Sequence, residues 1–124
     1  MSKNATIKCL PDGRIQFGTG RIETPRNKVL KVDGDVVCFQ VNGKHTAFVN
    51  VSDYIRLSLW AHRLTMDHKI LSKGVISYDN CYEHKSLAAA IMRTSKGERV
   101  NYKNKDHLDC RKENLIVKEN LFWL

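Results

Sequence analysis

Residues 99–117, RVNYKNKDHLDCRKENLIV, bring together side chains that could act on a phosphodiester bond. Asp106, His107 and Asp109 lie close together there, and carboxylates and imidazoles are common ligands of divalent metal ions. However, polar residues in a turn are usually solvated. We therefore treat these three residues as weak metal candidates and predict no metal site.

The four cysteines do not indicate a zinc site. They are scattered along the chain without a Cys-x-x-Cys pair, and structural zinc sites usually contain such pairs. Free thiols in a reducing compartment fit this pattern better. The short Gly18-x-Gly20 stretch lacks the lysine and following helix of a phosphate loop, so we also expect no cofactor.

Length and charge indicate a single basic domain. The chain has 124 residues and a formal net charge of +8, which favours an anionic partner such as nucleic acid or an acidic protein surface. No apolar run approaches the roughly 20 residues that span a bilayer. The first residues also lack the apolar stretch of a secretory signal. We expect no membrane partner and a cytoplasmic location.

The first part of the chain, 1–50, is predicted to be a β-rich subdomain. Short runs rich in Val, Ile and Phe alternate with turn signals, among them Asp33-Gly34-Asp35 and Asn42-Gly43. Glycine readily accepts positive φ, so these two turns suit tight hairpins. A small antiparallel sheet or meander follows.

The second part, 51–124, is predicted to contain helices. VSDYIRLSLWAHRL, 51–64, indicates a helix with Ser52 or Asp53 as its cap and a core-facing stripe of Val51, Ile55 and Leu59. A strand pair is expected around Lys73-Gly74, and YEHKSLAAAIMRT predicts a second helix.

A strand at 99–102, a polar turn and a short helix after Asp109 are expected to complete the chain. The predicted fold class is α+β, with the two parts forming one compact domain.

From about Thr46 onward the chain resembles small phage HNH homing-endonuclease-like proteins. Their C-terminal pattern runs Leu-His-Arg-Leu-Ile-Met, a Gly-containing link, then Val-Asp-His-x-Asn-Gly-Asp-x-Leu-Asp-Asn-Arg-x-x-Asn-Leu-Arg. Here LAAAIM, 87–92, is followed without gaps by RTSKGERVNYKNKDHLDCRKENLIV. The resemblance implies a C-terminal HNH-like ββα unit.

The same resemblance implies that the catalytic residues are replaced. Tyr102 stands where the family has its general-base histidine, and Asn101 where it has a metal-binding aspartate. Tyrosine has a pKa of about 10, and hard cations prefer carboxylates to amides. The His-Arg pair becomes Ala88-Ala89, and the final metal ligand would fall at Trp123. We therefore expect no catalytic residue.

The retained positions belong to the scaffold of the unit. By the resemblance, Asn114 braces the loop through hydrogen bonds, and Val100, Leu108 and Leu115 form a small core. Asp109 is expected to cap the last helix, and Arg111 to tie it to the hairpin together with Asn114.

The segment from 93 to 118 carries eight cations against four acids, and in the family this region faces the duplex. Such cations contact phosphates and give salt-dependent affinity. The alternative is a solvated charged rim. The residues predicted to bind nucleic acid are Arg93, Lys96, Arg99, Lys103, Asn104, Lys105, Arg111 and Lys112.

These observations favour a catalytically inactive HNH-endonuclease-like protein of phage type that binds DNA in the host cytoplasm. The alternative is a phage-encoded interaction protein that inhibits a host enzyme or defence complex, for which Phe122, Trp123 and Leu124 are apolar anchors if exposed. A residual metal-dependent nuclease using Tyr102 is favoured least.

Overall fold

The computed structural model describes residues 6–67, 74–79 and 84–119. Within these ranges the chain is mostly β-structure, with four small antiparallel sheets and two short α-helices. The broad α+β prediction is therefore confirmed, although the helices are shorter than expected. No helix in the described ranges is long and apolar enough to cross a membrane.

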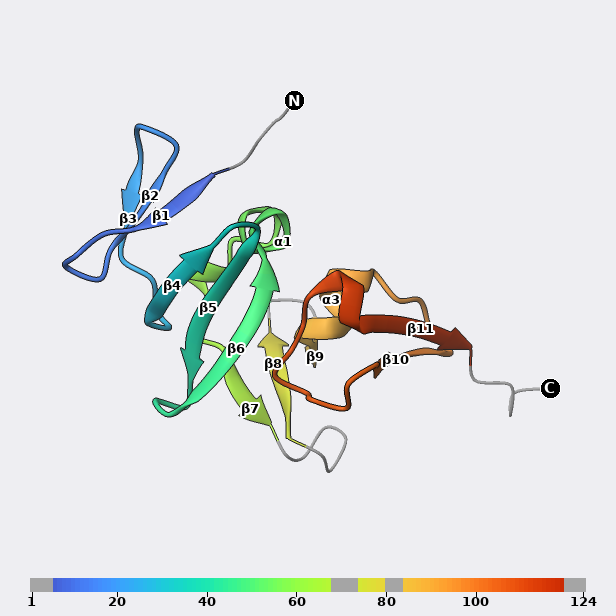
Figure 1. Ribbon diagram of the computed structural model, residues 1–124. Coiled ribbons are helices and arrows are strands. Elements are labelled where there is room, and N and C mark those ends of the chain that lie inside the picture. The colour runs from blue at the N-terminus through green and yellow to red at the C-terminus, as the bar shows by residue number, and fades with distance from the viewer. Residues whose placement is uncertain (1–5, 68–73, 80–83, 120–124) are drawn as a thin grey trace.

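The N-terminal part is antiparallel β-structure, as its β-prone runs and turn signals predicted, but it forms two three-stranded sheets and not one (Figure 1). The strands of the two sheets are β1 Ile7–Cys9, β2 Ile15–Phe17 and β3 Ile22–Glu23, then β4 Val29–Asp33, β5 Val36–Val41 and β6 His45–Asn50.

The β5–β6 turn has positive φ at both central residues, 56° at Asn42 and 76° at Gly43. This turn conformation matches the twist of the flanking strands, which explains why Asn-Gly predicts a tight hairpin.

The hydrophobic core lies on one face of the β4–β5–β6 sheet. Val37, Phe39 and Val49 project from this face and are fully or almost fully buried. Tyr54 and Leu59 pack against them from the segment that follows β6. Of the predicted core-facing stripe, Val51 and Leu59 are buried and the half-buried Ile55 packs against the core, which confirms the prediction.

The expected helix over 51–64 is interrupted. Helix α1 spans Val51–Arg56, and after Ser58 a single 3-10 turn, η1, covers Leu59–Ala61. Ser58 has φ 52°, a left-handed conformation that ends the helical path. The interruption lets Leu59 enter the core while the ring of Trp60 lies 4.6 Å from that of Phe17.

The prediction of a Ser52 or Asp53 cap is wrong. Asn50 occupies the N-cap of α1. Asp53 is instead buried, with 1% of its surface exposed, and pairs with Arg56 at 3.1 Å. Asp53 therefore has a tertiary role that a capping pattern does not reveal.

The middle of the chain forms a third sheet, in which β7 Thr65–Asp67 pairs with β8 Val75–Asp79 and β8 pairs with β9 His84–Ser86. The second strand of the expected pair is present as β8, whereas the segment expected to form the first, 68–73, lies outside the described residues. Helix α3 spans Leu87–Met92, and the hydroxyl of its N-cap Ser86 accepts a 3.1 Å hydrogen bond from the amide of Ala89. The alanine-rich run is therefore helical, as predicted.

The last sheet is a hairpin of β10 Glu98–Tyr102 and β11 Leu115–Glu119, with α3 packed against it (Figure 1). The short helix expected directly after Asp109 is wrong. A single 3-10 turn, η2 Lys112–Asn114, leads straight into β11. The alternating Leu115-Ile116-Val117 run pairs with β10 and buries Leu115, which favours a strand over a helix. Residues 120–124, which include Phe122, Trp123 and Leu124, lie outside the described residues.

Candidate nucleic-acid interface

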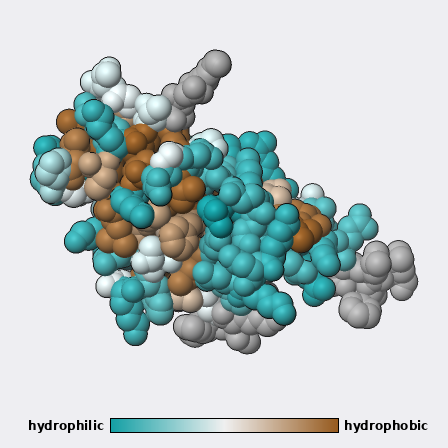
Figure 2. Space-filling model, viewed as in Figure 1, coloured by the Kyte–Doolittle hydropathy of each residue, from teal (hydrophilic) through white to brown (hydrophobic). Residues whose placement is uncertain are grey.

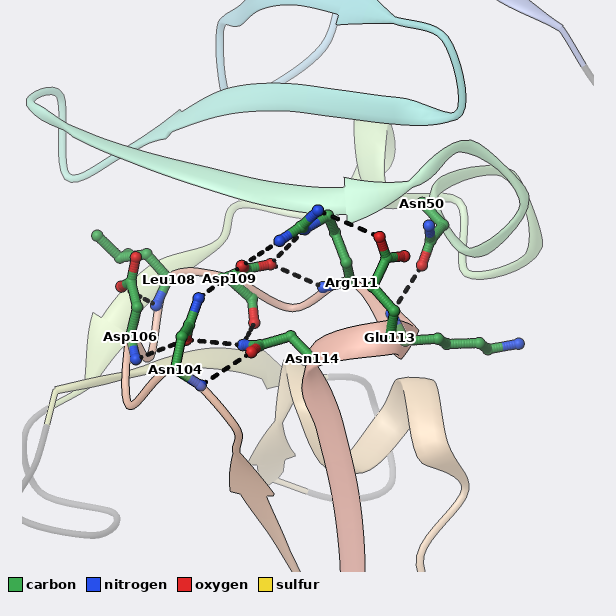
Figure 3. A network of polar contacts seen from close by, with 9 residues as sticks. Asn50, Asn104, Asp106, Leu108, Asp109, Arg111, Glu113 and Asn114 are labelled. Atoms are coloured by element: carbon green, nitrogen blue, oxygen red, sulfur yellow. Dashed lines mark hydrogen bonds and ion pairs between the residues drawn. The ribbon is translucent and has the colours of Figure 1, made fainter.

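The loop of residues 103–111 joins β10 to η2 and is held by an internal polar network (Figure 3). The side chains of Asn104 and Asn114 face each other in the close-up. The Asn114 amide nitrogen donates to the Asn104 side-chain oxygen and to the Asp109 backbone carbonyl, each at 2.9 Å. The Asn104 backbone amide donates to the Asn114 side-chain oxygen at 3.0 Å. Asn114 thus carries the bracing hydrogen bonds predicted for it.

Asp109 is the charged centre of the network. One carboxylate oxygen accepts from Arg111 Nε at 2.8 Å and the other from Arg111 Nη2 at 2.7 Å. These hydrogen bonds from the guanidinium hold the pKa of Asp109 below its ordinary value, although burial opposes the shift. Asp109 therefore remains a carboxylate near neutral pH. Its side chain pairs with Arg111 and does not cap a helix, contrary to the prediction.

The three weak metal candidates do not form a metal-binding cluster in the described part of the chain. The carboxylate of Asp109 is committed to Arg111 and to the Asn104 amide. Asp106 accepts a 3.0 Å hydrogen bond from the amide of Leu108, a local turn contact. The ring of His107 lies 4.8 Å from that of Tyr102.

Tyr102 occupies a poor position for a general base. Its ring points to the inner side of the hairpin and packs against the hydrophobic core and His107. Burial raises the pKa of the Tyr102 phenol further above its ordinary value, with the nearby Cys110 thiol adding to the shift. Near neutral pH this phenol is therefore protonated and cannot accept a proton from water.

The residues expected to form a small core beneath the hairpin join the main hydrophobic core of the described chain. Leu115 is buried, and Val100 and Leu108 pack against the same hydrophobic cluster. Ala88, in helix α3, is 1% exposed and belongs to this core.

The loop also pairs with the N-terminal sheet. The Phe48 amide donates to the Leu108 carbonyl at 2.9 Å, and the Cys110 amide donates to the Phe48 carbonyl at 2.8 Å. These bonds place residues 108–110 along the edge of β6. The loop is thus fixed to a rigid strand.

A second tether joins η2 to α1. The side-chain oxygen of Asn50 accepts from the Lys112 amide at 2.7 Å, and the Lys112 ammonium lies 3.3 Å from the Asp53 carboxylate. Sequence reasoning did not predict the contacts of Asn50 and Asp53 with Lys112, because these residues lie about sixty positions apart in the chain and no local pattern links them.

The structure divides the predicted nucleic-acid-binding residues into two groups. Arg111, Lys112 and Asn104 form internal contacts, with Arg111 paired to both Asp109 and Glu113. The second group is exposed and forms no ion pair with any other described residue; it comprises Arg93, Lys96, Arg99, Lys103 and Lys105.

Lys118 is one of the eight cations of this region and lies outside the predicted set of nucleic-acid-binding residues. It pairs directly opposite Arg99 across the hairpin. Like charges at directly opposite positions destabilise a sheet, so this pair has a local energetic cost. Figure 2 shows a largely hydrophilic surface over the side of the molecule where the hairpin and its loop lie. The pairing depends on strand register, which the sequence pattern alone did not give.

A groove of about 420 Å³ lies between the outer face of the β4–β5–β6 sheet and the 103–111 loop. Val36, Cys38 and Phe48 supply its apolar lining, and charged residues at its border include Lys31, Asp33 and Arg111. Burial raises the pKa of the Cys38 thiol, so this cysteine is a neutral part of the groove. The groove has no counterpart in the sequence predictions.

A scan of the chain against models of protein families found no match, and searches of curated proteins and of solved structures likewise found none.

Proposed function

We propose that this protein is a catalytically inactive, HNH-endonuclease-like protein of phage type that binds duplex DNA through the hairpin and its loop. In this proposal β10, the 103–111 loop and β11 correspond to the two strands and the connecting loop of a ββα unit. The loop network preserves the shape of the unit, and the exposed cations provide the contacts to phosphates.

The observation that carries the proposal is the Arg99–Lys118 pair. A protein gains nothing in stability from two cations opposite each other on a two-stranded sheet. A polyanion placed across the pair removes the repulsion and releases its own counterions. Lys103 and Lys105, exposed and without an ion pair among the described residues, extend this charge into the loop. A nucleic-acid backbone fits such a row of cations.

The proposal that the protein does not cut DNA rests on the chemistry of two side chains. Hydrolysis by the family's route needs a proton acceptor near pH 7 and a tightly held divalent cation. Tyr102 supplies a half-buried, protonated phenol, and Asn101 supplies a neutral amide. Asp109, the buried carboxylate of the loop, is neutralised by Arg111. Neither requirement is met by these residues.

One experiment tests both halves of the proposal. The full-length protein is incubated with supercoiled plasmid in Mg²⁺ or Mn²⁺, and its binding to a duplex from the same plasmid is measured at increasing salt. We expect unchanged plasmid and an affinity that falls steeply between about 50 and 200 mM salt. Efficient nicking would overturn the inactive assignment and support the residual nuclease, and salt-independent or absent binding would overturn the DNA assignment.

The groove beside Phe48 favours the second candidate, a phage-encoded interaction protein that inhibits a host enzyme or defence complex. Its apolar lining and charged border resemble the composition of a small protein-binding surface. A pull-down from host lysate with and without nuclease treatment discriminates between the candidates. A stoichiometric protein partner that survives nuclease, and is lost in the Phe48→Glu variant, would favour this reading over DNA binding.

A further inference from the structure

The β10–β11 hairpin has an outer face whose composition differs from that of its inner face. Because side chains alternate along a strand, Val100 and Tyr102 share the face that packs against the core. Arg99 and Asn101 therefore project from the opposite face. In the register of the hairpin, Lys118 lies opposite Arg99 and Ile116 lies opposite Asn101. The outer face is thus two adjacent cross-strand pairs, one cationic and one amide–aliphatic.

The amide–aliphatic pair combines an amide without a hydrogen bond among the described residues and an exposed aliphatic side chain. The Asn101 side chain is half-buried, yet it forms no hydrogen bond with any other described residue. Ile116 is one of three large hydrophobic side chains of the described chain with at least 36% of their surface exposed. An amide without a protein hydrogen-bond partner costs free energy where water is excluded, but costs little where water can hydrogen-bond to it. Together they form a surface able to distinguish ligands by hydrogen bonding and by shape.

We infer that this outer face reads base edges in the major groove of duplex DNA, with Asn101 and Ile116 contacting one A·T pair. The inference rests on the proposed DNA binding and adds a specific mode of recognition to it. An asparagine amide makes two hydrogen bonds to the N6 and N7 atoms of adenine, and an aliphatic side chain contacts the thymine methyl group. Both features occur in the major groove and belong to the same base pair.

The dimensions of the hairpin agree with this placement. The major groove, about 12 Å wide, admits a two-stranded β-ribbon. Directly opposite side chains of an antiparallel pair have Cβ atoms about 5 Å apart, which suits simultaneous contact with the two bases of one pair. Residues two apart on a strand are separated by about 6.8 Å, close to two base-pair steps of about 3.4 Å. Arg99 and Lys118 therefore lie about two base-pair steps along the groove from the contacted pair, where their long side chains extend outward to the phosphates.

The experiment begins with selection of bound sequences from a library of random-sequence duplexes, using the full-length protein. We expect an enriched sequence with an invariant A·T pair. The Asn101→Ala variant should lose about tenfold or more in preference for that sequence while keeping its affinity for random duplex. Gln16→Ala, which removes an amide from β2 in another sheet, is the matched control and should leave the preference unchanged.

Modified bases test the contacts without changing the protein. Replacing the invariant adenine by 7-deazaadenine removes N7, and replacing its thymine by uracil removes the methyl group. The first change should weaken wild-type binding about tenfold and leave Asn101→Ala insensitive. The second should weaken wild-type binding about fourfold and leave Ile116→Ala insensitive.

The experiment separates failure of base reading from failure of DNA binding itself. Salt-dependent duplex binding with no enriched sequence, or wild-type binding that is indifferent to both modified bases, would overturn base reading and leave the proposed function in place. Absence of any duplex binding would overturn both. A loss of preference in Asn101→Ala with an unaltered thermal melt, together with the matching loss on 7-deazaadenine, would establish the contact.

Discussion

The carboxylate of Asp109 and the guanidinium of Arg111, two residues apart, form a two-point ion pair at 2.7 and 2.8 Å. The Asp109 side chain is 5% exposed, whereas that of Arg111 is 33% exposed. The pair therefore joins the buried centre of the 103–111 loop to its surface. Because the same carboxylate accepts from the Asn104 amide at 2.9 Å, the loop conformation depends on its charge.

This dependence predicts a loss of stability in acid. The folded-state pKa of Asp109 is lower than its ordinary value, so its contribution to stability is fully present above about pH 5. The contribution is lost as the pH falls below about 4 and through the folded-state pKa. Asp109→Asn removes the charge with little change in shape and should reduce the free energy of unfolding at pH 7 by about 2 kcal/mol.

Denaturant unfolding at pH 7 and pH 3 measures the effect. The gap between wild type and Asp109→Asn should shrink at the lower pH, since the Asp109 carboxyl then approaches the neutral state that the asparagine amide has at both pH values. An equal gap at the two pH values would contradict the assignment of the stabilising interaction to the Asp109 carboxylate.

Asn114 is predicted to be the most sensitive polar residue of the loop. It is 5% exposed and its side chain forms three hydrogen bonds, two of them with Asn104. Asn114→Ala leaves the Asn104 amide and the Asp109 carbonyl without these partners and should cost about 3 kcal/mol. The neighbouring Glu113, 63% exposed, provides the matched control, because Glu113→Ala should change stability by less than about 0.5 kcal/mol.

Amide hydrogen exchange adds a local measurement to the unfolding experiment. The backbone amide of Asn104 should lose protection in Asn114→Ala and keep it in Glu113→Ala. Similar protection of this amide in both variants would show that the Asn114 side chain does not hold the loop.

The sequence predicted the turns and strands whose conformation depends on neighbouring residues in the chain. The Asn42-Gly43 turn and the strands around it follow from positive φ and side-chain alternation. The strand over 99–102 and the bracing Asn114 were also predicted. The strand β11 was not, because the charged run before Leu115 has a helical composition and only pairing with β10 makes it extended.

The sequence predicted which residue types make up the candidate site, but not how the fold arranges their side chains. A basic segment can be counted from the sequence, yet Arg111 and Lys112 turn out to neutralise acids inside the fold. Lys118 instead joins Arg99 on the surface, because the twelve residues between the strands close into one particular register. Register and long-range ion pairs depend on the whole fold, so residue type and spacing do not determine them.

The Asp53 carboxylate is predicted to stabilise the fold more than either of its cations does. One of its oxygens contacts both Arg56 and Lys112, and the other, Oδ2, is buried without a hydrogen-bond partner among the described residues. Asp53→Ala would leave Arg56, whose guanidinium also donates to the Ile91 carbonyl, beside an empty space, at a cost of about 3 kcal/mol.

Lys112→Ala should cost less than about 1 kcal/mol, since the Lys112 side chain is 53% exposed. Equilibrium unfolding of the two single variants and of the double variant measures these terms and their coupling. If Lys112→Ala lowered the free energy of unfolding as much as Asp53→Ala, the exposed Lys112 side chain would stabilise the fold as strongly as the buried carboxylate. That result would contradict the prediction.

Replacing either Arg99 or Lys118 by alanine should raise stability but weaken DNA binding. Arg99→Ala or Lys118→Ala removes a cross-strand repulsion and should raise the free energy of unfolding by a few tenths of a kcal/mol, within the range of about 0.2–1 kcal/mol for such pairs. The same changes should weaken duplex binding and reduce the slope of log affinity against log salt by about one each.

The control for this prediction is Arg14→Ala, in the β1–β2 hairpin, where the arginine pairs with Asp12 at 2.7 Å. This variant also removes one positive charge, so it tests whether net charge alone governs the affinity. Its salt slope should match that of wild type. An equal loss of slope in Arg14→Ala and Arg99→Ala would assign the affinity to the overall field of the protein, and the β10–β11 face would no longer be the site of contact.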